Sequence, residues 1–239
     1  NSGFGEHSAT AGDIDGDGFS DLLVGAGGYD AGQTDEGRVY LYRGSGDGLA
    51  TNAQATFNIN DPSGSGTLGW TVASAGDVNG DGFSDVIIGA PFHRLGGRAW
   101  VFLGSLTGVS TTIHADLAPD VDDAQFGYGV SSAGDVNGDG YDDVVVGAPE
   151  YYYDAQRDFF AGRVFVYYGS ATGVDTVADY TDPRFQPSAI LFDDEFGRVT
   201  CSAGDVNGDG FGDFYVGDSG NLYLGSATGP DDTFFFASP

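Results

Sequence analysis

Residues 126–149 read FGYGVSSAGDVNGDGYDDVVVGAP, in which an acidic loop stands between two short apolar stretches. The same arrangement begins at Phe4, Leu68 and Phe196, and the four copies align without gaps. Their acidic loops start at residues 13, 77, 135 and 205, so successive copies lie 64, 58 and 70 residues apart. A repeat of this length indicates an array of similar units, each of which packs against its neighbours.

Each copy predicts four short strands, which we call A to D in chain order. Strand A precedes the acidic loop, and a β-branched or aromatic stretch bounded by glycine follows it as strand B, at residues 22–24, 86–88, 144–146 and 214–216. Strand C is expected at residues 38–43, 98–103, 163–168 and 221–224, each time before a Gly-Ser turn. A weaker strand D is expected at residues 55–59, 111–115, 176–180 and 233–236.

An antiparallel sheet of this kind cannot bury both faces alone, so neighbouring sheets must stack face to face. The sequence therefore predicts an all-β β-propeller of four four-stranded antiparallel blades. It forms one domain over residues 1–239, with units of about 1–61, 62–120, 121–182 and 183–239. Three arrangements are open: a closed four-bladed ring, a homodimer that closes an eight-bladed ring, and a fragment of a longer propeller. Of these we expect self-association.

The charge balance excludes some classes of function. The chain has 36 acidic residues, 8 arginines and no lysine, for a formal net charge of −28. This excludes a nucleic-acid binder with a basic surface. No run of about 18 apolar residues occurs, so no membrane span is expected. So many carboxylates must be either solvated or bound to cations.

The acidic loops have the composition of a calcium site. Side-chain oxygens at loop positions 1, 3, 5 and 9 and the main-chain carbonyl at position 7 are the hard oxygen ligands that Ca²⁺ prefers, and glycine at position 6 permits a sharp bend. The predicted ligands of four Ca²⁺ ions are Asp13, Asp15, Asp17, Phe19 and Asp21; Asp77, Asn79, Asp81, Phe83 and Asp85; Asp135, Asn137, Asp139, Tyr141 and Asp143; and Asp205, Asn207, Asp209, Phe211 and Asp213.

Two other interpretations of these loops are weaker. Polar hairpin turns also use Asp, Asn and Gly, but four copies with the same ligand spacing argue against turns alone. An EF-hand needs a glutamate at position 12 and flanking helices. Position 12 is Val24, Ile88, Val146 or Val216, each inside a predicted strand, so an EF-hand is excluded.

The Phe-Gly pair before each loop and the Gly-Ala-Pro triplet after it resemble the FG-GAP repeat, which occurs in the β-propeller of integrin α-subunits and in many bacterial surface and secreted proteins. The resemblance covers essentially the whole chain. It implies that calcium binds the hairpin between strands A and B at the residues named above. Gly27, Leu68 and Asp218 depart from the usual motif, and none of them is a predicted metal ligand.

The connections B–C and D–A are expected on the rim opposite the calcium loops, and they vary in every unit. Variable loops on a repetitive scaffold are where recognition is usually placed, and aromatic and arginine side chains are enriched in binding hot spots. The candidate ligand-binding residues are Trp70, Tyr128, Arg198, Tyr151, Tyr152, Tyr153 and Arg157. The alternative is that these side chains pack a long loop onto its neighbour or form a subunit contact.

The favoured function is a calcium-stabilised extracellular or cell-surface module for binding or adhesion, whose ligand is an unknown protein or glycan. Weak calcium sites suit the outside of a cell, where calcium is abundant. One alternative is a calcium-dependent self-assembling half-propeller. Another is a propeller-fold polysaccharide hydrolase or lyase, for which Glu6, His7 and Arg198 are the nearest acid–base set. No nucleophile elbow or paired-histidine motif occurs, so we do not expect an enzyme.

Overall fold

The computed structural model describes residues 2–30, 32, 34–59, 66–154, 159–160, 162–182, 195–217 and 220–235, with only the backbone for residues 152–154, 159–160 and 232–235. Over these residues the protein is all-β, and no helix able to cross a membrane occurs among them. The strands form four four-stranded antiparallel sheets and one additional two-stranded hairpin. The predicted number of sheets and of strands in each sheet is therefore confirmed.

The four sheets follow the chain in order, one repeat to each sheet. The first contains β1 (Ser8–Gly12), β2 (Asp21–Gly25), β3 (Val39–Tyr42) and β4 (Ala55–Phe57), and the second β5 (Thr71–Gly76), β6 (Asp85–Ala90), β7 (Arg98–Phe102) and β8 (Ala115–Leu117). The third contains β9 (Val130–Gly134), β10 (Asp143–Ala148), β13 (Arg163–Tyr167) and β14 (Tyr180–Thr181), with the hairpin β11 (Tyr152–Asp154) and β12 (Phe159–Phe160) inserted between β10 and β13. The fourth contains β15 (Thr200–Gly204), β16 (Asp213–Val216), β17 (Asn221–Leu224) and β18 (Asp231–Phe235).

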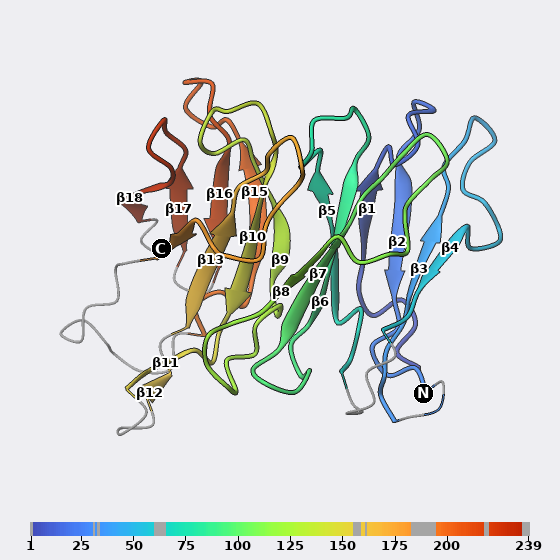
Figure 1. Cartoon of the computed structure of the whole chain (residues 1–239), viewed down its shortest axis with the longest axis horizontal. Helices are drawn as coiled ribbons and strands as arrows, with labels where there is room; N and C mark the ends of the chain where they lie inside the picture. The colour runs from blue at the N-terminus through green and yellow to red at the C-terminus, as the bar shows by residue number, and fades with distance from the viewer. Residues whose placement is uncertain are drawn as a thin grey trace.

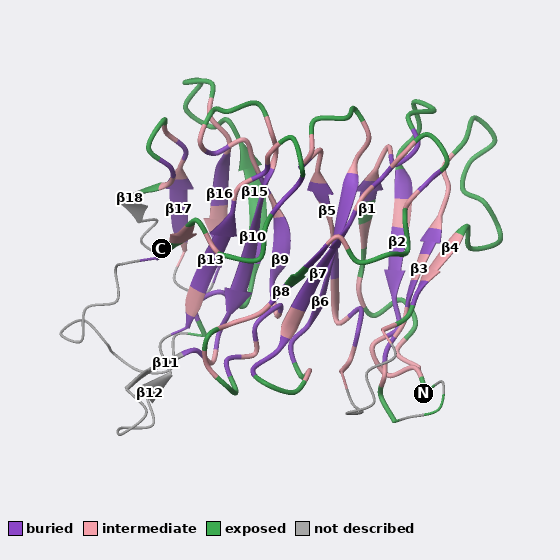
Figure 2. Ribbon diagram, viewed as in Figure 1, coloured by how far each residue is buried: buried purple, intermediate pink, exposed green. Residues whose placement is uncertain are grey.

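The sheets stand face to face in a row, and their first strands pack against each other in the order β1, β5, β9 and β15 (Figure 1). The apolar side chains form three buried clusters, one between each pair of neighbouring sheets. The buried residues, drawn purple in Figure 2, accordingly make up most of the inner strands. Strand β10 shows how one strand serves two cores, since Val144 and Val146 pack toward the second sheet and Val145 toward the fourth. Both faces of this strand are therefore covered, which explains its continuous apolar sequence.

Glycine allows neighbouring sheets to approach closely at one level of the row. A Cβ atom on Gly89, near the end of β6, would lie 2.1 Å from the main-chain oxygen of Gly127, just before β9. The same 2.1 Å separates such an atom on Gly25 from the oxygen of Gly69. The glycines of the Phe-Gly and Gly-Ala-Pro motifs are therefore partners across the space between sheets, which explains why both recur in each unit.

The row is open. Within the described part of the chain, no packing comparable to that between neighbours joins the fourth sheet to the first, and the two sheets lie at opposite ends of the molecule (Figure 1). The side chains of β15 are exposed after Thr200, and Val199 and Val206 are 50% and 51% exposed. A closed ring of four blades is therefore not formed by these residues.

The D strands of the second and third sheets begin later than predicted. We expected them at Thr111–Ala115 and Thr176–Tyr180, whereas β8 begins at Ala115 and β14 at Tyr180. The Thr112 amide donates to Ser110 Oγ at 3.2 Å, and the Val177 amide donates to Asp175 Oδ1 at 2.7 Å. These side chains hold local turns that compete with strand pairing.

Replacing Gly89 with alanine tests the close approach between the second and third sheets. The backbone of Gly89 lies outside the positive-φ region, so the added methyl group acts through steric overlap, with the main chain of Gly127 and with Thr71 Oγ1 at 2.3 Å. We expect Gly89→Ala to lower the free energy of unfolding by about 1–3 kcal/mol, measured by urea denaturation. Gly46→Ala is the control, since its Cβ would meet only the Phe19 ring at 3.6 Å. Equal stability of the two variants would contradict the proposed contact.

Candidate functional site

The aspartate at loop position 9 ties two connections together at the base of each acidic loop. Asp85 is fully buried, its Oδ2 accepts from the Val78 amide at 2.9 Å, and its Oδ1 accepts from the Gly104 amide at 2.8 Å. Val78 lies in the A–B loop and Gly104 begins the C–D turn. The corresponding aspartates of the other sheets make the same pair of hydrogen bonds: Asp21, Asp143 and Asp213. The A–B loops and C–D turns therefore share one rim.

The aspartate at position 1 folds each loop back on itself. In the second loop, Asp77 Oδ1 accepts from the Asp81 amide at 3.0 Å and Asp77 Oδ2 accepts from the Gly82 amide at 2.9 Å. Asp81 Oδ1 in turn accepts from the Phe83 amide at 3.0 Å. Gly82 at position 6 has a φ of 89°, a left-handed conformation that glycine adopts without strain. The predicted sharp bend at position 6 is therefore confirmed.

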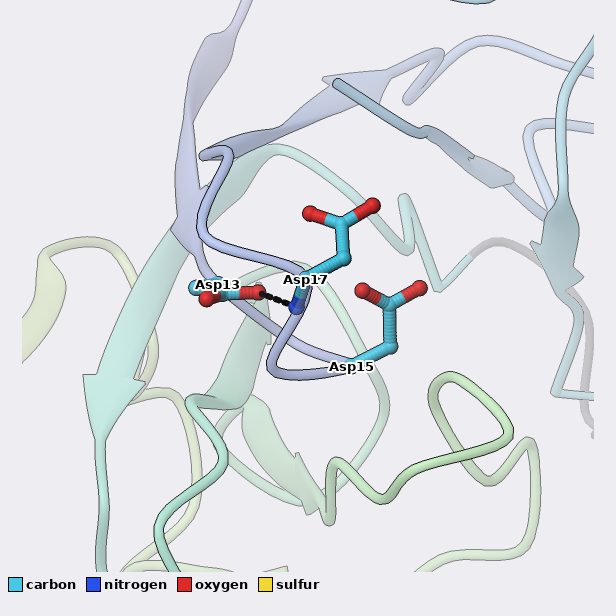
Figure 3. A group of neighbouring side chains, drawn as sticks. All are labelled: Asp13, Asp15 and Asp17. Carbon is cyan, nitrogen blue, oxygen red and sulfur yellow. Dashed lines mark hydrogen bonds between the residues drawn. The ribbon is translucent and has the colours of Figure 1, made fainter. Parts of the chain in front are cut away.

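The first loop brings three carboxylates together. One oxygen from each of Asp13, Asp15 and Asp17 lies within 4.8 Å of the other two, and the side chains of Asp15 and Asp17 point to the same side of the loop (Figure 3). Asp15 is only 4% exposed, and neither of its carboxylate oxygens accepts a hydrogen bond. The guanidinium of Arg43 makes an ion pair with Asp15 and lies 3.3 Å from Asp17 Oδ2. The pairing with Arg43 offsets part of the cost of burying Asp15, and three carboxylates with one guanidinium leave a net negative charge that suits a divalent cation.

The other three loops carry asparagine at position 3. Asn79 donates from Nδ2 to Asp81 Oδ2 at 2.9 Å, and its Oδ1 accepts from the Asp81 amide at 3.0 Å. The pairs Asn137 with Asp139 and Asn207 with Asp209 repeat this geometry. The structure thus brings positions 3 and 5 together in these loops. Position 9 lies at the loop base, with both carboxylate oxygens already accepting from amides and each retaining a second lone pair.

Burial shifts the ionisation of the position-9 aspartates. Desolvation, aided by the carboxylates at positions 1 and 5, raises the pKa of Asp85 and Asp143 to about 7, although the two amide hydrogen bonds of each act in the opposite direction. The pKa of Asp21 is raised for the same reason. A divalent cation nearby would favour the ionised form and oppose these shifts.

Neighbouring loops interlock along the row. The Ser84 amide donates to the Asp13 carbonyl at 3.0 Å, and the Asp142 amide donates to the Asp77 carbonyl at 3.1 Å. The link between the second and third loops is reinforced, because Asp142 Oδ2 accepts from the Asp77 amide at 2.8 Å. The ring of Tyr141 also covers Gly80, where a Cβ atom would lie 2.8 Å from it. Each loop is therefore held partly by the next one in the chain.

The opposite rim carries a cluster of aromatic side chains near a pocket. The Trp70 ring lies 4.9 Å from the Phe92 ring and 5.6 Å from the Tyr128 ring, and the Arg198 guanidinium lies 5.1 Å from the Tyr128 ring. Arg198 also pairs with Glu195. The adjoining cavity of about 210 Å³ is lined by Phe92, Gln125, Tyr128, Pro149, Glu150, Glu195 and Arg198.

Three of the predicted ligand-binding residues, Trp70, Tyr128 and Arg198, are thus brought together. Phe92, Gln125, Glu150 and Glu195 were missed. Their position in the variable B–C and D–A connections was the available signal, but nothing in their spacing distinguished them from neighbouring residues.

The remaining predicted ligand residues have a different outcome. Tyr151 is buried, its hydroxyl donates to Asp120 Oδ1 at 2.7 Å, and the guanidinium of Arg163 lies 4.0 Å from its ring. Burial and Asp120 raise the pKa of Tyr151 to about 12. Tyr151 therefore packs the long loop onto the sheet, as the alternative interpretation held. Tyr152 and Tyr153 lie in β11, where only the backbone is described, and Arg157 lies outside the described residues.

The acid–base set considered for a polysaccharide-cleaving enzyme is not assembled. The His7 ring lies 5.5 Å from the Trp70 ring, and Arg198 is engaged by Glu195 and Tyr128. Within the described residues, no hydrogen bond or ion pair joins any two of Glu6, His7 and Arg198. No observation favours catalysis at this rim.

The raised pKa of Asp85 and Asp143 predicts a pH dependence of stability without divalent cations. The folded protein takes up protons near pH 7 that the unfolded chain binds only near pH 4, so stability is lost as pH rises through the folded pKa. When the pH is lowered from about 8 to about 6 in the presence of a chelator, we expect each of the two aspartates to raise the free energy of unfolding by about 1 kcal/mol, measured by urea denaturation. Asp143→Asn should remove about half of this gain, and a stability independent of pH would contradict the assignment.

Comparison with known protein families matches the FG-GAP repeat at residues 4–42, 68–102 and 126–167, which lie in the first three sheets. Among curated proteins, integrin alpha-PS3 of Drosophila melanogaster is 37% identical over 152 residues, or 60% of this chain. Integrin alpha-4 of Xenopus laevis is 35% identical over 146 residues, or 58% of this chain. Integrin alpha pat-2 of Caenorhabditis briggsae is 32% identical over 232 residues, or 88% of this chain.

These relatives are much longer proteins, of which the matched stretches cover 13%, 14% and 17%, respectively. The matched FG-GAP segments include both the Phe-Gly side and the Gly-Ala side of the close contacts between sheets. Sequence motif, sheet architecture and relatives agree, and the chain belongs to the FG-GAP repeat family.

Proposed function

We propose that the chain is a calcium-stabilised extracellular binding module of the integrin α-like propeller type. The observation that carries the proposal is the group of three acidic side chains, Asp13, Asp15 and Asp17, of which Asp15 is buried and is paired only with the guanidinium of Arg43. The single charge of Arg43 leaves a net negative charge on this group, which a divalent cation would offset more fully. Oxygen ligands in a loop with a position-6 glycine suit Ca²⁺.

The proposed ligands are the side chains at positions 1, 3, 5 and 9 and the carbonyl at position 7 of each loop. In the first loop these are Asp13, Asp15, Asp17, Asp21 and the carbonyl of Phe19. When bound, calcium supplies positive charge that holds these oxygens together, which makes its role structural. Four such ions would reduce the formal charge from −28 to about −20. Interlocked loops would then carry the stabilisation from one sheet to the next.

The binding function is proposed for the opposite rim. The cavity there is bordered by aromatic rings, an arginine and two glutamates from three different sheets. Such a combination of a rigid aromatic surface and charged groups is typical of recognition sites. The relatives named above are integrin alpha chains, which supports an adhesion or recognition role outside the cell. The ligand class we infer is a protein or a glycan.

A second candidate function is calcium-dependent self-assembly into a homodimer that completes a ring. The open row favours it, because the exposed Val199 and Val206 leave apolar surface at the end of the fourth sheet. Light-scattering mass on a sizing column would test it. A mass near twice 24.7 kDa in calcium, and near 24.7 kDa in chelator, would support assembly. A single-chain mass in both conditions would rule it out.

Replacing Asp81 with alanine tests the proposed calcium site of the second loop. Wild-type protein should melt at a higher temperature in about 10 mM calcium than in chelator. In Asp81→Ala we expect this gain to be smaller by about 3–8 °C, because one binding site is lost. Asp47→Ala, which removes an exposed carboxylate from the same rim, should keep the full gain. An undiminished calcium response in Asp81→Ala would exclude a site in this loop.

Replacing Arg198 with alanine tests the binding rim. Labelled protein would be applied to an array of immobilised glycans and extracellular-matrix proteins in about 1 mM calcium. We expect Arg198→Ala to weaken retention at least about tenfold, because it removes a charged hot-spot side chain from the cavity. Arg94→Ala, an exposed arginine on the same rim, should bind as the wild type does. Retention that is unaffected by Arg198→Ala would place recognition elsewhere.

A further inference from the structure

The first repeat differs from the other three by two charges. At loop position 3 it has Asp15, where the other repeats have Asn79, Asn137 and Asn207. Immediately before the Gly-Ser turn it has Arg43, where the others have Leu103, Tyr168 and Leu224. The additional carboxylate and the additional cation therefore occur in the same repeat, although 28 positions separate them in the sequence.

The fold brings these two charges into contact. Arg43 follows β3 directly, and its Nη2 forms ion pairs with the Oδ2 atoms of both Asp15 and Asp17. The backbone at this point is fixed, because the amide of the next residue, Gly44, donates to Asp21 Oδ1 at 2.8 Å. The Arg43 side chain is 35% exposed, so solvent is available to it if it leaves the loop.

The guanidinium therefore lies between two of the three carboxylates that would bind a metal. It carries a permanent positive charge and has no acceptor, so it cannot itself be a metal ligand. A divalent cation close to Asp15 and Asp17 would be repelled by it at short range. Both cations cannot occupy the space between these oxygens.

We propose that Arg43 is a built-in counter-cation of the first loop, which a divalent cation must displace from Asp15 and Asp17 in order to bind. This inference rests on the cation-binding function proposed above. It accounts for the burial of the Asp15 carboxylate, whose charge is paired with that of Arg43. It also assigns the first loop the lowest affinity of the four, although it has the most carboxylates. The first loop fills last as calcium rises and empties first as calcium falls.

Native mass spectrometry during a calcium titration tests this order, because it counts the ions bound to each molecule. We expect wild-type protein to pass through a state with three ions before the fourth binds. Arg43→Leu, which introduces the residue of the second repeat, should lower the dissociation constant of the last ion about five- to tenfold. The control is Arg38→Leu, which removes an equal charge from the other end of the same strand, where Arg38 bonds Asn58.

A second variant assigns the gained ion to the first loop. Adding Asp17→Ala to Arg43→Leu should remove that ion and leave three. If the gained ion persists, or if Arg43→Leu binds the last ion as weakly as wild type or more weakly, the inference is wrong. Failure of the proposed function gives a different result, since wild-type protein would then bind no calcium in the millimolar range.

A third variant covers the case in which Arg43→Leu fails to fold because Asp15 loses its partner. The pair Asp15→Asn with Arg43→Leu gives the first loop the same set of proposed ligands as the second, without a buried unpaired charge. We expect this variant to fold and to fill its four sites over one calcium range, without a persistent three-ion state. A three-ion state as persistent as in the wild type would overturn the proposal.

Discussion

The carboxylate of Asp85, buried and shared between the amides of Val78 and Gly104, represents the interaction on which every repeat depends. It joins the A–B loop to the C–D turn, so three of the four strands of a sheet are held at one end by one side chain. A buried carboxylate is expensive, and its cost is offset by hydrogen bonds and by nearby positive charge. The cation proposed for the acidic loop above it would contribute such a charge, and would stabilise both the loop and its base.

The repeats predict the sheets well because their pattern is local. Val144, Val145 and Val146 alternate between two cores, and the flanking glycines mark the close contacts between sheets, so strand B could be placed from its residues alone. The D strands could not be placed as well, since Ser110 and Asp175 divert the chain into turns. The sequence also left open whether the row closes, since a closed ring, a half-ring that dimerises and a fragment all fitted the repeats. Closure depends on the angle accumulated between successive sheets, and no residue pattern states that angle.

In the candidate sites too, groups that lie close together in the sequence could be predicted, whereas contacts between distant parts of the chain could not. Positions 1, 3 and 5 of the loops lie within a few residues of one another, and their grouping in the first loop follows from spacing. Arg43 reaches that loop from strand C, so only the fold shows that it faces Asp15. On the opposite rim, Trp70 and Tyr128 occupy the same place in successive repeats and were predicted together. For Tyr151 the sequence left ligand binding and loop packing open, and only the fold shows that Asp120 and Arg163, from different parts of the chain, hold it in a packed position.

Because neighbouring loops interlock, the carboxylates of one loop affect the electrostatics of the next. Asp142 accepts from the amide of Asp77 in the preceding loop, and burial raises the pKa of Asp142, so the second and third loops share one electrostatic environment. A cation bound in either loop reduces the repulsion felt by the other. At the corresponding junction between the first and second loops, the second loop has a serine, Ser84, in place of an aspartate, and the first loop has Arg43 as a positive charge of its own. The third and fourth loops also meet without a carboxylate, at Gly212, so Arg43 is the feature that sets the first loop apart, and by our proposal it keeps the carboxylates of that loop paired when calcium is scarce.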